Sequence, residues 1–451
     1  STRNDGSDLL RPPLEPALYT SISPGTQAAI AGLPANPGTL PHPGTAMNSR
    51  SRARTAPYAC VVGDISLVRA LGIRKLPVAV ATSDADAKCL RSRYCRIVVK
   101  TPSWFREPDA AVTAIIEWAR QQASLPVLFY QGDHDLVAIS RARERLAPHF
   151  RFVLPSAELV EDLTDKVRFF ALARRHDLLV PDTLAVPLGA GASKALQQWD
   201  RFPCVCKPAT RAENWYEFIG RYQKALHIET RGELESLLPK IEASNARFLI
   251  QASVEGGEEN ILSYHAYVRP SGEIVAEFTG RKIRTAPKVY GRSTYVEITD
   301  DREVRDLGRA TVAKLGFSGV LKIDFKRDRR DNRLYMLEIN PRFNLWHHPA
   351  TVAGVGIPEA VFWDCVEPET VEPTKSAKKG VRWMAPMSDA RAFGEYHTSG
   401  QLSRARWLFE MLTVEVNEGF QISDPMPMIA DVTRLLTRMF SKDRRMVVDL
   451  P

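Results

Sequence analysis

Short apolar runs alternate with amphipathic stretches along the chain from about residue 57 onward. Apolar runs at 58–62, 78–81, 97–99 and 127–130 have the length of buried strands, and the segments 65–71, 110–123 and 136–146 are expected helices. Strands that alternate with helices are typical of a parallel sheet with helices on both faces. We therefore expect residues 57–155 to form a parallel α/β domain.

A different pattern, with longer strands, follows between residues 156 and 365. We expect helices over 164–176 and 301–315, and a helix from Thr230 that Pro239 ends or kinks. The expected strands are 202–207, 248–252, 264–268, 274–278, 320–326 and 334–339. The last two are joined by the polar turn Arg-Asp-Arg-Arg-Asp-Asn and predict a hairpin. This second region is therefore expected to be of the α+β class.

The two ends of the chain differ from both regions. After residue 366 a linker containing Pro and Lys precedes expected helices near 403–412 and 427–440, so 366–451 is expected to be a linker and a helical C-terminal extension. Residues 1–56 are rich in Pro, Gly, Ser, Thr and Ala without sustained periodicity, which favours disorder. The first methionine is Met47, where we expect natural translation to begin. Residues 1–46 would then be an added leader or an extended reading frame, and a genuine disordered tail is the alternative.

The composition is that of an ordinary globular protein. Of 451 residues, 44% are hydrophobic and 25% charged, and a net charge of +8 is too dilute to identify an anionic partner. No apolar run approaches the ~18–20 residues that span a bilayer. The six cysteines do not form a disulfide framework, and Cys204 and Cys206 lack a second Cys or His pair at zinc spacing.

These features predict a cytoplasmic protein with reduced thiols and no membrane partner. Arg329-Arg330 and Arg444-Arg445 are short basic pairs without an aromatic platform, so we expect no nucleic-acid partner either.

The expected hairpin carries the strongest chemical signal in the sequence. Asp324 lies on its first strand, and Glu338 and Asn340 lie on its second. Residues two apart on a strand share a face, and an antiparallel partner can bring Asp324 opposite them. Oxygen ligands dominated by carboxylates suit Mg²⁺, which also keeps water or phosphate oxygens. The alternative is that these are exposed polar positions of an amphipathic hairpin.

Cationic residues at the ends of other elements favour the metal interpretation. Lys166 begins a helix, Lys207 ends an apolar strand, and Arg342 directly follows the hairpin. Arg281, Lys282 and Arg284 follow the strand that ends at Phe278. A polyphosphate bound to Mg²⁺ requires such donors, although each one singly is most often a solvated charge. Gly256-Gly257, beside Glu258 and Glu259, would let the backbone approach a nucleotide while a carboxylate accepts from its ribose.

Six motifs in a fixed order connect these residues to a known family. They are Asp-Lys-Val-Arg-Phe-Phe (165–170), Phe-Pro-Cys-Val-Cys-Lys-Pro (202–208), Leu-Ile-Gln-Ala-Ser-Val-Glu-Gly-Gly-Glu (249–258), Phe-Thr-Gly-Arg-Lys-Ile-Arg (278–284), Ile-Asp-Phe-Lys-Arg-Asp (323–328) and Leu-Glu-Ile-Asn-Pro-Arg (337–342). From about residue 58 to 365 the chain resembles the ATP-grasp superfamily, and within it the carboxylate–amine ligase branch that contains D-aspartate ligase-like enzymes.

The resemblance implies a domain layout. Residues 57–155 would be a Rossmann-like pre-ATP-grasp domain, followed by a two-lobed ATP-grasp domain at 156–365. The lobes would be about 156–247 and 248–365, with the C-terminal extension after them.

The resemblance also implies roles for individual residues. Lys166 and Lys207 would contact the phosphates of ATP, and Glu258 or Glu259 the ribose. The adenine would lie against a hinge formed by Gln251, Ala252, Ser253 and Val254. Arg281, Lys282 or Arg284 would reach the γ-phosphate or an acyl phosphate, and Arg342 would neutralise the transferred phosphoryl group. Asp324, Glu338 and Asn340 would hold two Mg²⁺ ions, with Mn²⁺ as an alternative.

The implied activity is ATP-dependent amide formation from a small carboxylate and an amine through an acyl phosphate, with release of ADP and phosphate. Two positions depart from the family. Gln251 stands where an acidic residue is common, and the run at 342–348, with His347 and His348, replaces small polar residues beside the expected acceptor site. The alternatives are an ATP-dependent carboxylase or carbamoyl-phosphate type of enzyme, and a nucleotide-binding regulator without catalysis. The C-terminal helices could cover the grasp domain or form a homodimer contact.

Overall fold

The computed structural model describes residues 56–187, 191–210, 225–243, 247–373, 376–430 and 432–433. The expected leader, except for Ala56, and most of the expected helix at 427–440 lie outside these residues. Within them, no helix has both the length and the apolar character needed to cross a bilayer.

The N-terminal part forms a fully parallel four-stranded sheet in the order β3-β2-β1-β4. Its elements are β1 (Ala59–Val62), α2 (Ile65–Ile73), β2 (Val78–Thr82), the 3-10 turn η1 (Lys88–Arg91), β3 (Cys95–Lys100), α3 (Pro108–Ala119), β4 (Val127–Tyr130), α4 (Asp133–Arg141) and α5 (Arg143–Leu146). The parallel α/β arrangement predicted from the sequence is confirmed. The expected helix at 136–146 is divided in two at Ala142.

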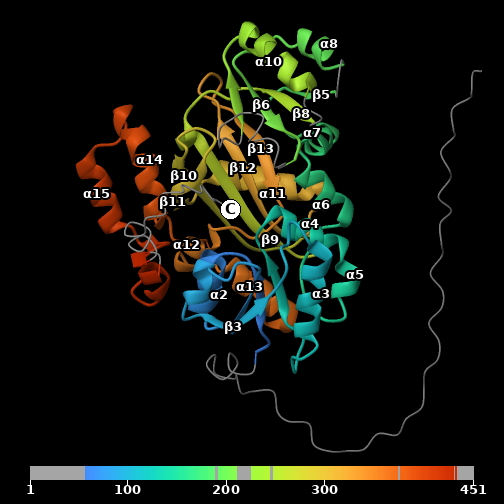
Figure 1. The fold of residues 1–451 in the computed structure, drawn as a ribbon, viewed down its shortest axis with the longest axis vertical. Coiled ribbons are helices and arrows are strands. Elements are labelled where there is room, and N and C mark those ends of the chain that lie inside the picture. The colour runs from blue at the N-terminus through green and yellow to red at the C-terminus, as the bar shows by residue number, and fades with distance from the viewer. Residues whose placement is uncertain are drawn as a thin grey trace, which may run out of the picture. The chain divides into compact units, whose positions relative to one another are not determined.

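A four-stranded antiparallel sheet in the order β5-β8-β6-β7 follows. Its elements and the helices around them are α6 (Ala157–Thr164), α7 (Lys166–Arg175), β5 (Thr183–Val186), α8 (Gly191–Gln197), β6 (Cys204–Pro208), β7 (Leu226–Ile228), α10 (Arg231–Ala243) and β8 (Phe248–Ala252). Figure 1 shows α8 and α10 at the end of the molecule that carries this sheet. Two expectations need correction. Pro239 does not end α10, which runs on to Ala243, and β8, expected to open the second lobe, pairs within this smaller sheet.

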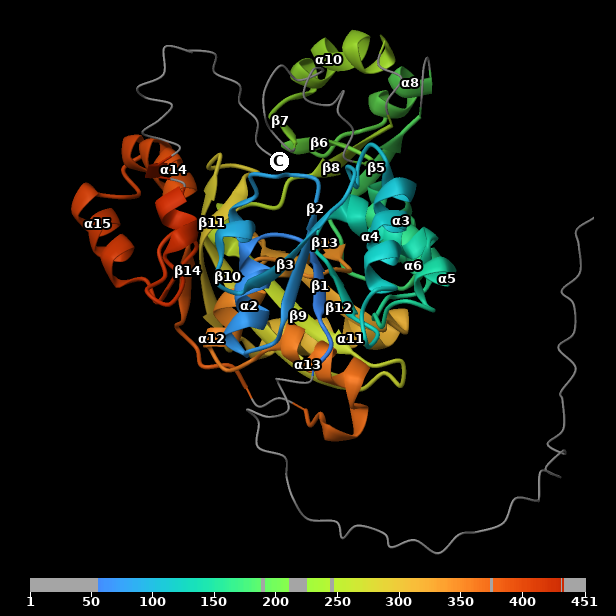
Figure 2. The same cartoon turned by 60° about the horizontal axis from the view of Figure 1, so that its bottom comes forward.

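The largest sheet has seven strands in the order β13-β12-β9-β10-β11-β14-β15. Its elements are the 3-10 turn η2 (Glu258–Asn260), β9 (Ile261–Val268), β10 (Ile274–Ala286), β11 (Arg292–Thr299), α11 (Arg302–Leu315), β12 (Gly319–Arg327), β13 (Leu334–Asn340), α12 (His347–Val352), α13 (Ile357–Val366) and the 3-10 turn η3 (Pro368–Thr370). Strands β9 to β13 are antiparallel, and β12 and β13 form the expected hairpin. Figures 1 and 2 show this sheet at the centre, with the parallel sheet on one side and the smaller sheet on another.

The C-terminal extension is more than a set of helices. It contains β14 (Arg382–Met384), α14 (Pro386–Thr398), α15 (Arg404–Thr413) and β15 (Val416–Asn417). Strand β14 pairs with β11 and β15 pairs with β14, so the extension enlarges the seven-stranded sheet. The segment after β15 returns to the N-terminal sheet, where Asp424 accepts from buried Arg69 of α2 at 2.9 Å and from Ser92 at 2.8 Å. The expected helix at 403–412 is confirmed as α15.

Candidate active site

One face of the seven-stranded sheet carries a row of polar side chains. Strand pairing places Glu338 of β13 opposite Asp324 of β12, and Asp324 opposite Ser263 of β9. The next row toward the C-terminus of β13 contains Asn340, Lys322 and His265. Residues in such rows share a face because side chains alternate along a strand. The hairpin geometry expected for Asp324, Glu338 and Asn340 is therefore present, with Lys322 added to it.

Asp324 is the buried centre of this cluster. Its side chain is flanked by two ammonium groups, with Lys322 Nζ 2.7 Å from Oδ2 and Lys282 Nζ of β10 at 3.6 Å. Burial opposes the charge on Lys282, yet Asp324, Glu258 and Glu338 together raise its pKa above the ordinary value. Burial lowers the pKa of Lys322, partly offset by Asp324. Lys282 therefore remains cationic beside the carboxylate.

The donor set fits a hard divalent cation. Asp324 is 2% exposed, yet its Oδ1 has no hydrogen-bond partner among the described residues. Glu338 is exposed and accepts from Asn340 Nδ2 at 3.0 Å, so one carboxylate reaches solvent and the other lies beneath it. An unpartnered buried carboxylate oxygen is costly unless another group completes its interactions. Two carboxylates and an amide oxygen provide the hard ligands that Mg²⁺ prefers. Within the described residues, no cluster of three or more His, Cys, Asp or Glu side chains is arranged for a metal, so the amide of Asn340 and substrate oxygens would have to complete this set.

The smaller sheet contributes cationic and amide groups that face this cluster. Lys207 ends β6 and donates to Gln251 Oε1 of β8 at 2.7 Å, while Gln251 Nε2 donates to Thr183 at 3.0 Å. Burial lowers the pKa of Lys207 to about 8, although Glu338 and Glu258 favour its charged form. Lys166, at the start of α7, also acts electrostatically on Lys207. Charged groups of the two sheets therefore lie within reach of one another.

The segment after β8 joins the two sheets and contains two acidic residues, Glu258 and Glu259, in different environments. Ser253 N donates to Pro203 O at 2.9 Å, and Val254 is buried. Glu258 is buried and accepts from the backbone N–H of Tyr290 at 3.3 Å. Glu259 is exposed and pairs with Arg329 at 2.8 Å. Of the two carboxylates expected near a ribose, Glu258 is the one whose charge acts on Lys207 and Lys282.

Arg342 connects the hairpin to the N-terminal domain. Its guanidinium pairs with Asp133, the first residue of α4, and donates to Asn340 Oδ1 at 3.4 Å. Burial works against its charge, but Asp133, Glu338 and Asp135 hold the pKa of Arg342 above its ordinary value. Burial also raises the pKa of Asp135 to about 6. This permanently cationic group therefore lies at the junction of the two domains.

The structure does not bring Arg281 and Arg284 into the cluster. Arg281 lies on the opposite face of β10 from Lys282, is exposed and pairs with Glu297 at 2.5 Å. Arg284 is buried among residues of the C-terminal extension, bonded to Asp389 at 2.8 Å and to Glu410 at 2.5 Å. The expectation that either residue reaches a phosphoryl group is not supported by its placement, and only Lys282 of the three faces Asp324.

The adjacent histidines at 347 and 348 are completely buried at the start of α12. Burial lowers the pKa of each to about 3, so both imidazoles are neutral. His347 packs against Phe343 with ring centroids 5.5 Å apart. Neighbouring Trp346 approaches the site so closely that a Cβ at Gly280 would lie 2.4 Å from its ring. The aromatic residues of this run therefore pack against the site, with Lys322 Nζ 5.8 Å from the centre of the Trp346 ring.

Three residues that sequence reasoning missed belong to the site. Lys322 lies two residues before Asp324, so strand alternation alone places it on the same face. Lys326 continues that alternation, and burial lowers its pKa although Glu258 favours the charged form. Asp133 is the partner of Arg342 across 209 residues, and only the tertiary fold reveals this contact.

The chain is similar to known proteins in both sequence and fold. No family model matches the chain. The sequence is 26% identical over 309 residues to D-aspartate ligase of Enterococcus faecium (strain Aus0004), covering 65% of this chain and 73% of that protein. An ADP complex of the N5-carboxyaminoimidazole ribonucleotide synthetase purK superposes with a TM-score of 0.54 at 14% identity, covering 72% of this chain and 81% of that one. Biotin carboxylase from Campylobacter jejuni has a TM-score of 0.53 at 14% identity, covering 70% and 72%.

The N5-carboxyaminoimidazole synthetase of Staphylococcus aureus gives a TM-score of 0.55 at 12% identity over 76% of this chain and 86% of that chain. The chain therefore shares its fold with N5-carboxyaminoimidazole ribonucleotide synthetases and a biotin carboxylase, and its sequence is similar to that of a D-aspartate ligase.

Proposed function

We propose that this protein joins a small carboxylate to an amine in an ATP-dependent reaction that passes through an acyl phosphate and releases ADP and phosphate. One observation carries the proposal. Buried Asp324, with an unpartnered oxygen, lies between Lys282 and Lys322 and across from Glu338, and the sheet that bears Lys207 faces this cluster. Anionic oxygens and cations concentrated in one protected place suit phosphoryl transfer, in which positioning and electrostatics provide most of the catalysis.

Residues at different places in the site have different proposed roles. Lys207, with Lys166, would bind the phosphates of ATP, and the segment Gln251, Ala252, Ser253 and Val254 would hold the base, with Glu258 at the ribose. Asp324, Glu338 and Asn340 would hold Mg²⁺, two ions in our proposal and Mn²⁺ as a substitute, which neutralises phosphate charge when bound. Lys282 and Lys322 would hold the anionic carboxylate near the phosphoryl group.

The proposed reaction has two steps. A carboxylate oxygen of the substrate attacks the γ-phosphorus of ATP, the bond from this phosphorus to the β,γ-bridging oxygen breaks, and ADP leaves. The amine nitrogen then attacks the acyl carbon, the carbon–oxygen bond to phosphate breaks, and the nitrogen loses a proton to solvent. Arg342, held by Asp133, would stabilise the charge on the phosphoryl oxygens.

The relative named as D-aspartate ligase suggests a first carboxylate to test. We propose an amino acid with an acidic side chain, such as D-aspartate, as the acyl donor, and a primary amine as the acceptor. Bicarbonate is the second candidate for the acyl donor, because a similar fold occurs in a biotin carboxylase domain whose complex contains bicarbonate. The six free cysteines support our further proposal of a reducing, cytoplasmic location.

The test is release of ADP and phosphate from MgATP in the presence of carboxylate pools, with and without amines. Release that requires both partners, and amide detected by mass spectrometry, is expected. Release with bicarbonate and no amine would favour the carboxylase alternative. ATP binding without release in any pool would favour a regulator, and absence of ATP binding would overturn the proposal.

A further inference from the structure

Helix α15 presents an apolar stripe to solvent. Ala405, Leu408, Phe409 and Leu412 recur at helical spacing, and all four are exposed, with Leu412 81% exposed and Phe409 63%. This i, i+3, i+4, i+7 pattern is the one that normally faces a protein core or another helix. In Figures 1 and 2, α15 lies at the margin of the folded part, with no described element outside it.

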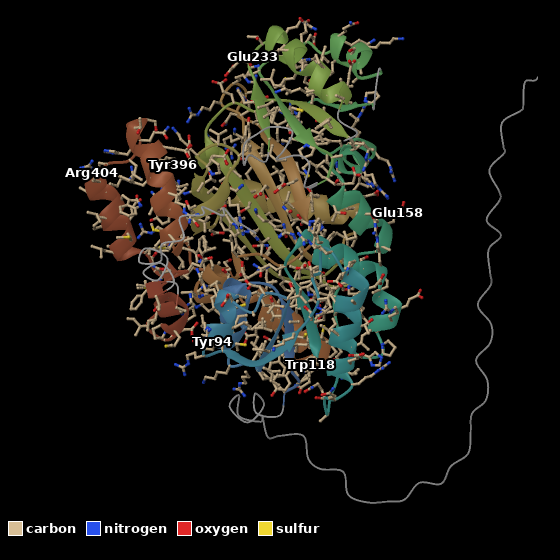
Figure 3. All side chains as sticks on the ribbon, viewed as in Figure 1. Tyr94, Trp118, Glu158, Glu233, Tyr396 and Arg404 are labelled. Atoms are coloured by element: carbon tan, nitrogen blue, oxygen red, sulfur yellow. The ribbon has the colours of Figure 1, made fainter. Side chains whose placement is uncertain are left out.

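The opposite face of α15 is the one that anchors it, through polar contacts. Glu410 accepts from buried Arg284 of β10 at 2.5 Å, and Trp407 Nε1 donates to Asp389 of α14 at 2.9 Å. Tyr396 of α14 accepts from the backbone N–H of Thr285 at 3.1 Å, which ties α14 to the same strand. Figure 3 shows Tyr396 on the side toward the sheet and Arg404 at the outer margin. The helix is thus fixed with its apolar stripe outward.

The stripe belongs to a region unusually rich in exposed apolar residues. Of fifteen large hydrophobic residues that are exposed in the described part of the chain, nine fall between 387 and 432. They are Met387, Leu408, Phe409, Leu412, Phe420, Ile422, Met426, Ile429 and Val432. Three of the nine, Leu408, Phe409 and Leu412, form the apolar stripe on α15, at exposures of 47%, 63% and 81%.

We propose that the outer face of α15 is the contact with a second copy of this chain, packed antiparallel to it across a two-fold axis. Charge complementarity argues for this partner. The first turn of α15 contains Arg404 and Arg406 and no acidic residue, and its last turn contains no basic residue. These cations lie at the unfavourable end of their own helix dipole. Antiparallel pairing places Arg404 of each copy beside the C-terminal end of the other helix.

Across a two-fold axis the same surface of both copies meets, so the apolar stripe must be complementary to itself. With the axis beside Leu408 and Phe409, Ala405 of one copy lies next to Leu412 of the other. The stripe itself contains no charged residue to be buried without a partner. Arg406 is already bonded to Glu410 at 2.9 Å, so it does not need a place in the interface.

The first test is the molar mass of the full chain by light scattering on a sizing column. The proposal predicts twice the 50.5 kDa of one chain, and a single-chain mass for the double variant L408E/L412E. The matched control is L307E, which changes an exposed leucine on α11 and is expected to leave the dimer intact. Thermal unfolding and ATP binding of each variant must match the unmodified chain, which separates loss of association from loss of folding.

The second test fixes the orientation. The pair A405C and L412C in one chain should form a disulfide between copies under oxidation, whereas either cysteine alone should give little cross-linked dimer. A single-chain mass for the unmodified protein would overturn the proposal, as would a dimer that survives L408E/L412E. Dimerisation only after removal of 434–451 would mean that this segment of the same chain covers the helix. A monomer that binds anionic vesicles would assign the face to lipid instead.

Discussion

Asp324 combines features that rarely occur together in a side chain with only a structural role. It is buried, two lysines share one of its oxygens, and the other oxygen has no partner among the described residues. Removing its charge would leave Lys282 and Lys322 without their common counter-ion. The residue therefore links the stability of the site to its chemistry.

We expect D324N and E338Q to reduce ADP release at least 100-fold, because each substitution removes a carboxylate from the proposed Mg²⁺ ligands. E338Q changes an exposed residue, so its thermal midpoint should stay close to that of the unmodified chain. E259Q is the matched control, since Glu259 is exposed and paired with Arg329, and it should retain activity within about twofold. Full activity of E338Q would remove the metal-site argument.

The proposed role of Lys207 at the ATP phosphates predicts that ATP binding depends on pH. Its pKa is lowered to about 8 by burial, so the ammonium is present below this pH and is lost as the pH rises through it. We therefore expect the Kd for MgATP to rise by up to tenfold per pH unit above about 8. Titration of the unmodified chain between pH 7 and 9.5 would measure this.

The conservative variant K207R provides the control for that titration. The arginine side chain stays protonated throughout this range, so its ATP affinity should depend little on pH. A flat profile for the unmodified chain, or an equally steep one for K207R, would contradict the assignment.

At the scale of elements, the alternation of side chains along strand β10, and the bulge that interrupts it, decide which face of the sheet each residue occupies. Arg281 and Lys282 point to opposite faces. K282A is expected to lower activity at least 100-fold, and R281A about twofold or less, under saturating substrates. Equal losses in the two variants would show that the face assignment is wrong.

The next cation on the same strand has a structural role in our account. Arg284, Asp389 and Glu410 form a buried ion cluster that attaches α14 and α15 to the sheet. Replacing Asp389 with Ala leaves a buried guanidinium short of its main partner, which costs about 3–5 kcal/mol of unfolding free energy. Urea unfolding would measure this loss.

Activity distinguishes the structural role from a catalytic one. The double variant R284M/D389L should recover part of the stability lost in D389A, because it removes the buried guanidinium together with Asp389 and leaves Glu410 paired with Arg406 at 2.9 Å. The folded fraction of each variant should keep near-normal turnover per molecule. A large fall in turnover of the folded protein would instead restore the catalytic role that the sequence suggested for Arg284.

At the scale of the whole molecule, local patterns in the sequence predicted ten of the strands, the hairpin and the placement of Asp324 opposite Glu338, but not β5, β7, β11, β14 or β15. These features depend on contacts between residues close in sequence and on the alternation of side chains along a strand, and both can be read from one sequence. The sheet to which β8 belongs could not be predicted, because an apolar run does not identify its partner strands. The position of Arg284 could not be predicted for a related reason. A bulge around Ile283 interrupts the alternation of side chains along β10, so Arg284 turns away from the face that Lys282 occupies.

Contacts between distant segments also lay beyond sequence reasoning. The pairing of Arg342 with Asp133 joins residues 209 positions apart, and Arg69 with Asp424 joins residues 355 apart. Both contacts tie the N-terminal domain to later segments. The candidate site is therefore held by the whole fold, although its central carboxylates lie on one hairpin.

The origin of the oxygen atoms in the released phosphate tests the central claim most directly. We would supply the carboxylate substrate labelled with ¹⁸O in its carboxyl group, together with MgATP and the amine, and analyse the phosphate by mass spectrometry. Attack of the carboxylate on the γ-phosphorus predicts one ¹⁸O atom in each phosphate released, and D324N should release almost none. Unlabelled phosphate formed at the same rate as amide would contradict an acyl-phosphate mechanism.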